Sequence, residues 1–292
     1  MTDWSYVFCD VFTDRPLAGN QLAVFPAAAA IPDALLQPLA REINFSETVF
    51  VYPPAGGGDA KIRIFTPAAE IRFAGHPVLG TAFVLGGESG RDEVRLETGA
   101  GLVPVTLERD GSRIVFGRMR QPIPSVRPFP HQDQLLAALG VARSELPVEL
   151  YDNGLQHVYV TLAGEDAVAG LEPDFNALIR LARAGSMATI GINCFAGSGG
   201  RWKTRMFAPA DGVPEDPATG SAAGPLACHL VRHGLVASGQ EIEISQGTEI
   251  GRPSTLIARA EVADDRIARV EVGGSAVIVA RGAFDPSVIA SP

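Results

Sequence analysis

The sequence predicts an α+β protein of two pseudo-symmetric lobes, each a curved, mostly antiparallel sheet wrapped around a central helix. The first observation is an internal repeat. Segments 63–82 and 205–222 both begin Arg-x-Phe-x-Pro, continue with a polar residue and a proline, and end in Gly-(Thr/Ser)-Ala. The two segments lie nearly half of the 292 residues apart, as expected for two similar lobes. The second observation is that strand-like segments dominate both halves and that one long apolar run follows each repeat.

The first lobe is expected to span residues 1–119. Apolar residues at helical spacing from Pro32 to Ile43 predict a helix with Asp33 in its first turn. A second helix is expected along the apolar run from Val78 to Leu85, whose small residues suit burial inside a curved sheet. The remaining β-rich segments are predicted strands: 6–12, 21–25, 47–52, 60–65, 94–98, 102–108 and 113–119.

Residues 120–130 contain four prolines and are expected to be the linker between the lobes. The second lobe is expected over 131–292, with its final strand as a candidate to return to the first lobe. Residues 153–160 resemble residues 18–25, a second echo between the halves. Helices are predicted at 133–139, 174–184 and 219–232, and strands at 191–196, 202–207, 241–245, 255–262, 266–272 and 276–280.

The composition narrows the function classes. The net charge is −9 and no run of Lys and Arg occurs, so neither nucleic acid nor an anionic membrane is an expected partner. The three cysteines show no Cys-x-x-Cys spacing, which fits a reducing compartment and predicts neither a disulfide framework nor a zinc site. No signal peptide and no membrane-spanning run is recognised, so a soluble cytoplasmic protein is expected. No metal site, P-loop or dinucleotide motif is visible.

The two copies of the repeat carry the candidate site. His76 and Asp216 each precede a proline, and each central helix is expected to begin at that proline. Gly75 and Gly220 allow a ligand to approach the backbone closely. Amides at a helix start bind carboxylates, so two such starts facing each other across an interlobe cleft would hold a small acid. The alternative interpretation is that Asp216 is an ordinary N-cap and His76 an ordinary turn residue.

Glu47 is the candidate acid or base. It opens an apolar strand beside Phe45, Val49 and Phe50, where partial desolvation would raise its pKa toward the range of a general base. The alternative interpretation is a solvated glutamate at the end of a strand.

Together, segments 10–20, 46–51, 64–82, 215–224 and 246–254 resemble the phenazine-biosynthesis isomerase family, the PhzF-like proteins, and the resemblance runs from about residue 6 to residue 281. It implies a diaminopimelate-epimerase-like fold, an interlobe active site without cofactor or metal, and usually a homodimer. In the family's phenazine enzyme a glutamate moves a proton between carbons of dihydro-3-hydroxyanthranilate. That glutamate falls on Glu47, and further site residues fall on His76, Asp216 and Ser221. Expected substrate-binding residues are Ser221, Gly75, Gly220 and Asn20.

Two rival functions remain open. Amino-acid racemases and epimerases resemble the chain at the same two turns but carry a cysteine in each, where this chain is expected to have Ala74 and Ala218. A non-catalytic protein that binds small acids would keep the cleft without turnover. The favoured prediction is a PhzF-like isomerase that shifts a proton within a small cyclic or hydroxylated carboxylic acid. In this prediction Glu47 is base and then acid, and whether His76 or Asp216 assists it stays open.

Overall fold

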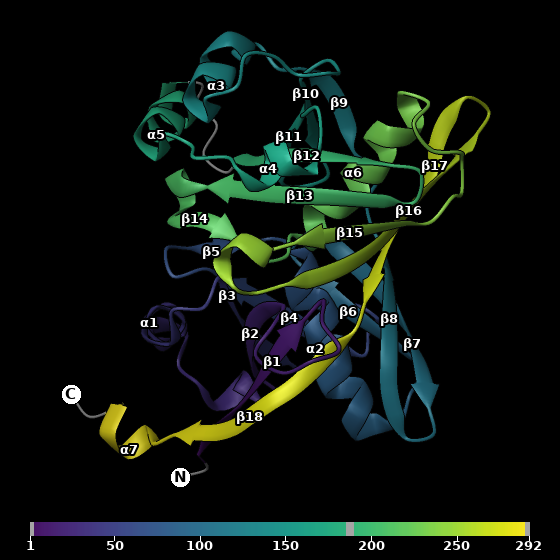
Figure 1. Cartoon of the computed structure of the whole chain (residues 1–292). Helices are drawn as coiled ribbons and strands as arrows, with labels where there is room; N and C mark the ends of the chain where they lie inside the picture. Colours follow the sequence, from purple (N-terminus) through teal and green to yellow (C-terminus); the bar gives the residue numbers. More distant parts are fainter. Residues whose placement is uncertain (1–2, 185–189, 290–292) are drawn as a thin grey trace. The chain divides into compact units, whose positions relative to one another are not determined.

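The computed structural model describes residues 3–184 and 190–289. The chain divides into two compact units, Met1–Arg120 with Gly273–Pro292 and Gln121–Val272. Figure 1 labels the elements of both units. Among the described residues, no helix combines the length and the apolar character that crossing a membrane requires.

The first unit is a sheet folded around one helix, α2 (Gly75–Ser89). This helix contacts strands from both ends of the unit's sequence, including the C-terminal strand. The strands are β1 (Trp4–Val11), β2 (Asn20–Phe25), β3 (Glu47–Tyr52), β4 (Ala60–Phe65), β5 (Glu70–Ile71), β6 (Glu93–Thr98), β7 (Gly101–Asp110), β8 (Arg113–Arg120) and β18 (Ala276–Phe284), with the further helices η1 (Ala28–Ala30), α1 (Asp33–Ile43) and α7 (Pro286–Ile289).

The centre of α2 is close-packed because it contains a glycine where the helix meets two strands. A Cβ atom on Gly80 would lie 2.6 Å from Leu22 Cδ2 and 2.7 Å from Val11 Cγ2. Only a residue without a side chain lets the helix backbone come this near to β1 and β2. The small residues noted in the sequence therefore serve the expected purpose, burial of the helix inside the sheet.

The second unit repeats this plan around α6 (Gly220–Arg232), which packs on β11 and β16. Its strands are β9 (Ser125–Pro128), β10 (Glu149–Asp152), β11 (Gln156–Thr161), β12 (Ile190–Ser198), β13 (Arg201–Ala208), β14 (Val213–Asp216), β15 (Ile242–Gln246), β16 (Ser254–Ala263) and most of β17 (Arg266–Gly274). The other helices are α3 (Gln132–Leu139), α4 (Glu165–Ala169), α5 (Phe175–Ala184), η2 (Pro209–Asp211) and η3 (Thr248–Ile250).

The strand pairings of the two units follow one scheme. In the first unit, β2 pairs parallel with β3, β3 antiparallel with β4, and β4 parallel with β6. In the second unit, β11, β12, β13 and β15 pair in the same senses and order. The predicted fold class, α+β with two similar halves each built on a central helix, is confirmed.

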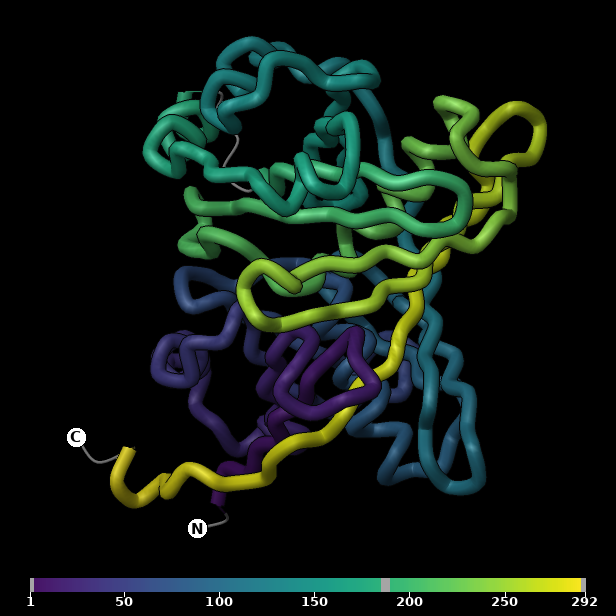
Figure 2. Tube along the Cα trace, viewed as in Figure 1, coloured from purple at the N-terminus to yellow at the C-terminus, as the bar shows by residue number. Residues whose placement is uncertain are grey.

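One strand of the first unit comes from the far end of the chain. The C-terminal strand β18 pairs antiparallel with β1, and Figure 2 shows it running beside the N-terminal strand. Segment 120–130 differs from the expected linker because residues 125–128 form β9, which pairs with β10. Prolines are tolerated at the ends of an edge strand, where a missing N–H costs no ladder hydrogen bond.

Candidate active site

In the first unit, strand register brings the candidate base beside its partners. Strands β2 and β3 are parallel, with Leu22 opposite Glu47, so their first residues lie at the same edge of the sheet. Asn20 opens β2 and Glu47 opens β3. The first turn of α2 adds Gly75 and His76. The four residues predicted for this half of the site therefore gather at one place.

A short chain of hydrogen bonds orients His76. The hydroxyl of Ser46 donates to Oδ1 of Asn20 at 2.9 Å. The amide nitrogen of Asn20 faces Nδ1 of His76 at 3.3 Å. The other ring nitrogen, Nε2, lies 3.4 Å from Oε2 of Glu47. The imidazole and the carboxylate are thus direct neighbours.

Burial keeps this imidazole neutral. Desolvation lowers the pKa of His76 to about 3, and a hydrogen bond with the backbone of Gln21 opposes it only in part. The side chain of Glu47 is 16% exposed, so it is not the solvated strand-end glutamate of the alternative interpretation. The neighbour of the Glu47 carboxylate is therefore a neutral imidazole and not an imidazolium.

In the second unit, Asp216 lies in a turn that precedes the helix. Asp216 ends β14, and α6 begins only at Gly220 with Thr219 as its N-cap. The hydroxyl of Thr219 donates to Oδ2 of Asp216 at 2.6 Å. Gln246 closes the turn, since its Nε2 donates to the backbone oxygen of Asp216 at 2.8 Å and its Oε1 accepts from the amide of Thr219 at 3.1 Å.

The expectation that each central helix begins at its proline is therefore wrong. Pro217 lies in the turn before α6, and Pro77 is the third residue of α2. The physical reason is that the hydrogen bonds of Thr219 and Gln246 hold residues 216–219 out of the helix. The interpretation of Asp216 as N-cap of α6 is wrong for the same reason.

The helix starts themselves reveal how the two copies correspond. Gly75 and His76 are the first two residues of α2, as Gly220 and Ser221 are of α6. By this comparison Ala74 corresponds to the N-cap Thr219, and not to Ala218. Neither position is a cysteine.

The three cysteines are Cys9, Cys194 and Cys228; all are buried with free thiols, and burial raises each thiol pKa well above its usual range.

Ser221 is held by two side chains from β11 and the turn before it. Nε2 of His157 lies 3.1 Å from the Ser221 hydroxyl oxygen. Nδ2 of Asn153 donates to the Ser221 backbone oxygen at 2.9 Å. That oxygen needs an outside donor because Pro225, four residues on and inside α6, has no N–H to give it.

The tautomer of His157 follows from its other contact. Nδ2 of Asn193 faces Nδ1 of His157 at 3.4 Å and also donates to the backbone oxygen of Gly191. Nδ1 then accepts, and Nε2 donates its hydrogen to the hydroxyl of Ser221. Burial lowers the pKa of His157 to about 4, so the ring is neutral near pH 7. Gly191 makes room for the ring, because a Cβ there would lie 2.7 Å from Nδ1.

The sequence analysis missed His157, Asn153 and Asn193 as site residues. A signal was present: residues 153–160 resemble residues 18–25, the segment that supplies Asn20. The two segments contain the equivalent strands β11 and β2.

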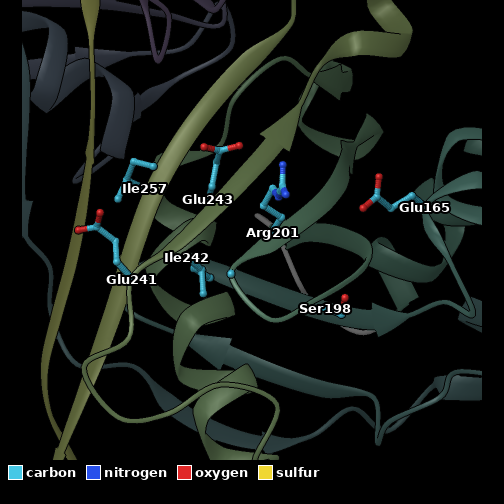
Figure 3. A pocket seen from close by; sticks show the side chains of 8 residues that line it. Glu165, Ser198, Arg201, Glu241, Ile242, Glu243 and Ile257 are labelled. Atoms are coloured by element: carbon cyan, nitrogen blue, oxygen red, sulfur yellow. The ribbon is translucent and has the colours of Figure 1, made fainter.

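A hollow within the second unit is not part of this group. Figure 3 shows it at the edges of β13, β15 and β16, with several charged side chains around it. No predicted site residue contributes to its lining, which consists of Glu165, Ser198, Gly200, Arg201, Glu241, Ile242, Glu243 and Ile257.

Comparison with known proteins extends over nearly the whole chain. The family model for phenazine biosynthesis-like proteins, PhzC-PhzF, matches residues 9–282. Two relatives named trans-2,3-dihydro-3-hydroxyanthranilate isomerase are similar to it along their length. The one from Pseudomonas fluorescens is 49% identical and the one from Pseudomonas aeruginosa 50% identical, each match covering 95% of this chain and 98% of the relative.

Solved structures agree on the fold. A predicted epimerase from Pseudomonas aeruginosa is 30% identical with a TM-score of 0.81, covering 97% of this chain and 99% of its own. A PhzF-family protein from Bacillus anthracis has a TM-score of 0.83 at 23% identity, with the same coverage. A probable proline racemase from Agrobacterium radiobacter shares the fold alone, with a TM-score of 0.66 at 14% identity over 97% of this chain and 93% of its own.

The resemblance drawn from the sequence motifs is thereby confirmed. The relatives at 49% and 50% identity are named as isomerases, and the family model covers residues 9–282. The chain is therefore an isomerase that belongs to the family of phenazine biosynthesis-like proteins.

Proposed function

We propose that this protein isomerises a small cyclic, hydroxylated carboxylic acid of the trans-2,3-dihydro-3-hydroxyanthranilate type, with Glu47 carrying a proton between two ring carbons. The observation that carries the proposal is the placement of Glu47, whose Oε2 lies 3.4 Å from Nε2 of the buried, neutral His76. The named activity of the relatives at 49% and 50% identity supplies the substrate class.

The proposed reaction needs one group that first takes and then returns a proton. The carboxylate of Glu47 removes a proton from one carbon, and the electron pair of that C–H bond moves into the conjugated system. The same carboxyl group returns the proton to another carbon, so no electrons are gained or lost and no cofactor is required. With a hydrogen on Nε2, His76 would hold the carboxylate and keep it aimed at the substrate.

Residues of the second unit are proposed to hold the substrate. The first amides of a helix lack partners within the helix and carry its positive dipole end. Those of Gly220 and Ser221 open α6 and suit the substrate carboxylate. Asp216, fixed by Thr219, would orient a hydrogen-bond donor of the substrate.

His157 is proposed as a positioning residue. Since its Nε2–H donates to the oxygen of Ser221, the hydrogen of the Ser221 hydroxyl is directed elsewhere. Ser221 therefore acts as a hydrogen-bond donor toward an oxygen of the substrate.

The central test is Glu47→Gln, which keeps the size of the side chain but removes its basicity. Turnover of trans-2,3-dihydro-3-hydroxyanthranilate, followed by absorbance, should fall by about 100-fold or more. Binding should remain, seen as a ligand-dependent rise of the melting temperature. The matched control is Glu42→Gln, an exposed glutamate at the end of α1, which should retain full activity.

The same experiment separates the rival functions. Activity of Glu47→Gln within a few-fold of wild type would remove Glu47 from the mechanism. Binding without turnover by the wild type would favour a non-catalytic acid-binding protein. Racemisation of proline or hydroxyproline by the wild type would contradict the proposal, and with it the interpretation of the Ala74 and Thr219 positions.

A further inference from the structure

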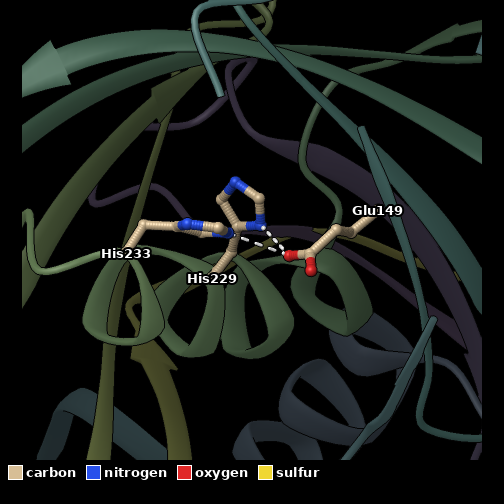
Figure 4. Close-up of side chains that lie close together, drawn as sticks. All are labelled: Glu149, His229 and His233. Carbon is tan, nitrogen blue, oxygen red and sulfur yellow. Dashed lines mark hydrogen bonds and ion pairs between the residues drawn. The ribbon is translucent and has the colours of Figure 1, made fainter. Parts of the chain in front are cut away.

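Two histidines and a glutamate converge at the far end of α6. His229 lies in the last turn of the helix and His233 is its C-cap, so the spacing of four residues puts both on one face. Glu149 opens β10 and points at both. Its Oε2 lies 3.2 Å from Nδ1 of His229 and 3.0 Å from Nε2 of His233. Figure 4 shows the three side chains meeting at one point, and their ligand atoms all lie within 4.8 Å of one another.

We propose that Glu149, His229 and His233 form a binding site for a Zn²⁺ ion. Two imidazole nitrogens and one carboxylate oxygen are a common protein donor set for zinc, with a water or further oxygen as the fourth ligand. Mg²⁺ and Ca²⁺ prefer oxygen donors, so a site with two imidazole ligands does not suit them. Zinc holds such ligands at about 2.0–2.1 Å, so neighbouring ligand atoms of a tetrahedral site are about 3.3 Å apart. The two measured separations match that spacing.

The ring hydrogens of the cluster can adapt to a cation. An imidazole can move its hydrogen to the other ring nitrogen and present a lone pair to the ion.

The side chains around the cluster are compatible with a bound ion. Arg232 binds the other carboxylate oxygen, Oε1, at 3.4 Å, which leaves Oε2 directed at the histidines. The hydroxyl of Tyr151 lies 3.1 Å from Oε2 and 3.3 Å from Nδ1 of His229, close enough to be the fourth ligand or to bind a water there. The side chain of His233 is 20% exposed, which gives an ion access from solvent.

This site is separate from the proposed active site. Ser221 is the second residue of α6 and His229 the tenth, so about 12 Å of helix lies between them at about 1.5 Å per residue. A zinc ion here would bind the end of α6 to β10. Its role would be structural, and its presence does not depend on the reaction proposed for Glu47.

The test uses the full-length, untagged protein, stripped with a chelator and then loaded with Zn²⁺ or with Co²⁺ as a visible probe. We expect one zinc per chain after gel filtration, and cobalt bands of a tetrahedral site with nitrogen and oxygen ligands. X-ray absorption of the zinc-loaded wild type should show two imidazole ligands. Zinc should also raise the melting temperature, because it binds the folded state.

Variants locate the ion. His233→Gln and Glu149→Gln should each weaken zinc binding by about 100-fold, the loss of one ligand. His131→Gln, at the start of α3, is the matched control and should bind as the wild type does. Wild-type protein that retains no zinc would overturn the proposal and leave the cluster a hydrogen-bonded network. Equal binding by His233→Gln and the wild type would overturn it too, since the ion would then lie elsewhere. His229→Gln is a less direct test, because His229 is fully buried and its loss also affects folding.

Discussion

In the proposed site, the buried His157 acts on the substrate only through the hydroxyl of Ser221. His157 and Ser221 are both nearly fully buried, and the donated hydrogen of Nε2 occupies one lone pair of the hydroxyl oxygen. Asn193 fixes the tautomer and Asn153 fixes the backbone of Ser221. The direction of one hydroxyl hydrogen therefore depends on three neighbouring side chains.

This arrangement predicts a specific result for His157→Phe. Phenylalanine fills a similar space but cannot donate to Ser221, so the hydroxyl is free to turn. We expect kcat/KM to fall by about 3–10-fold, the value of one neutral hydrogen bond, mainly through a higher KM. In the Ser221→Ala background the same change should have almost no further effect, because His157 acts through Ser221. Additive losses in the double variant would show that His157 acts by another route.

The sequence predicted the grouping of Glu47, His76 and Asn20 better than it predicted the residues around Ser221. Glu47, His76 and Asn20 lie in motifs that could be recognised locally, and the structure brings them together. His157 contacts a residue 64 positions away, and such a contact depends on how β11 packs on α6. A buried histidine in a strand is not distinguishable from a core residue in the sequence alone.

At the scale of elements, the central helices are shaped by the residues that interrupt them. Two glycines of α2 differ in their surroundings. A Cβ on Gly80 would meet Leu22 and Val11 at under 3 Å, whereas a Cβ on Gly87 would meet nothing within 4 Å. Both positions are helical, so both would gain about 1 kcal/mol of helix propensity from alanine.

We therefore expect opposite effects from two chemically identical changes. Gly80→Ala should lower the free energy of unfolding, because overpacking a core contact costs about 1–3 kcal/mol and outweighs the gain in propensity. Gly87→Ala should raise it by about 0.5–1 kcal/mol. Urea denaturation of the two variants beside the wild type measures both. A stabilised Gly80→Ala would mean that the sheet yields readily around α2.

The boundaries of elements were harder to predict than their existence. The long apolar runs predicted both central helices, because small and apolar residues continue for more than two turns. The start of α6 could not be read from the proline, since side-chain bonds from Thr219 and Gln246 decide it. Strand β9 could not be predicted because prolines surround it in the sequence. Its pairing with β10 in the structure identifies it as a strand.

At the scale of the whole molecule, the two halves of the sequence build one strand-pairing scheme twice. The repeat in the motifs predicted this duplication. The sequence only hinted at the return of the last strand: β18, near the C-terminal end of the chain, joins the first unit through β1. Strand partners so far apart in sequence leave no local signal.

Both units also bury histidines that are neutral in the folded state. Burial lowers the pKa to about 3 for His76 and to about 4 for His157, from the usual 6.5. Between pH 6.5 and these values the unfolded chain binds protons that the folded chain does not, so stability falls as the pH falls. Glu149 adds to the loss below its usual pKa of 4.5. Asp211 opposes it in part, since burial raises its pKa to about 6.

The expected outcome is a protein that is distinctly less stable at pH 5 than at pH 8. Each fully buried histidine accounts for at most about 2 kcal/mol of the difference, at 1.36 kcal/mol per pH unit below 6.5. Urea denaturation at the two pH values measures it. His157→Gln should start from a lower stability at pH 8 but lose less on acidification, because one proton fewer is taken up on unfolding. His131→Gln should lose as much as the wild type. Stability that is constant or higher at pH 5 would show that these histidines are protonated inside the folded protein.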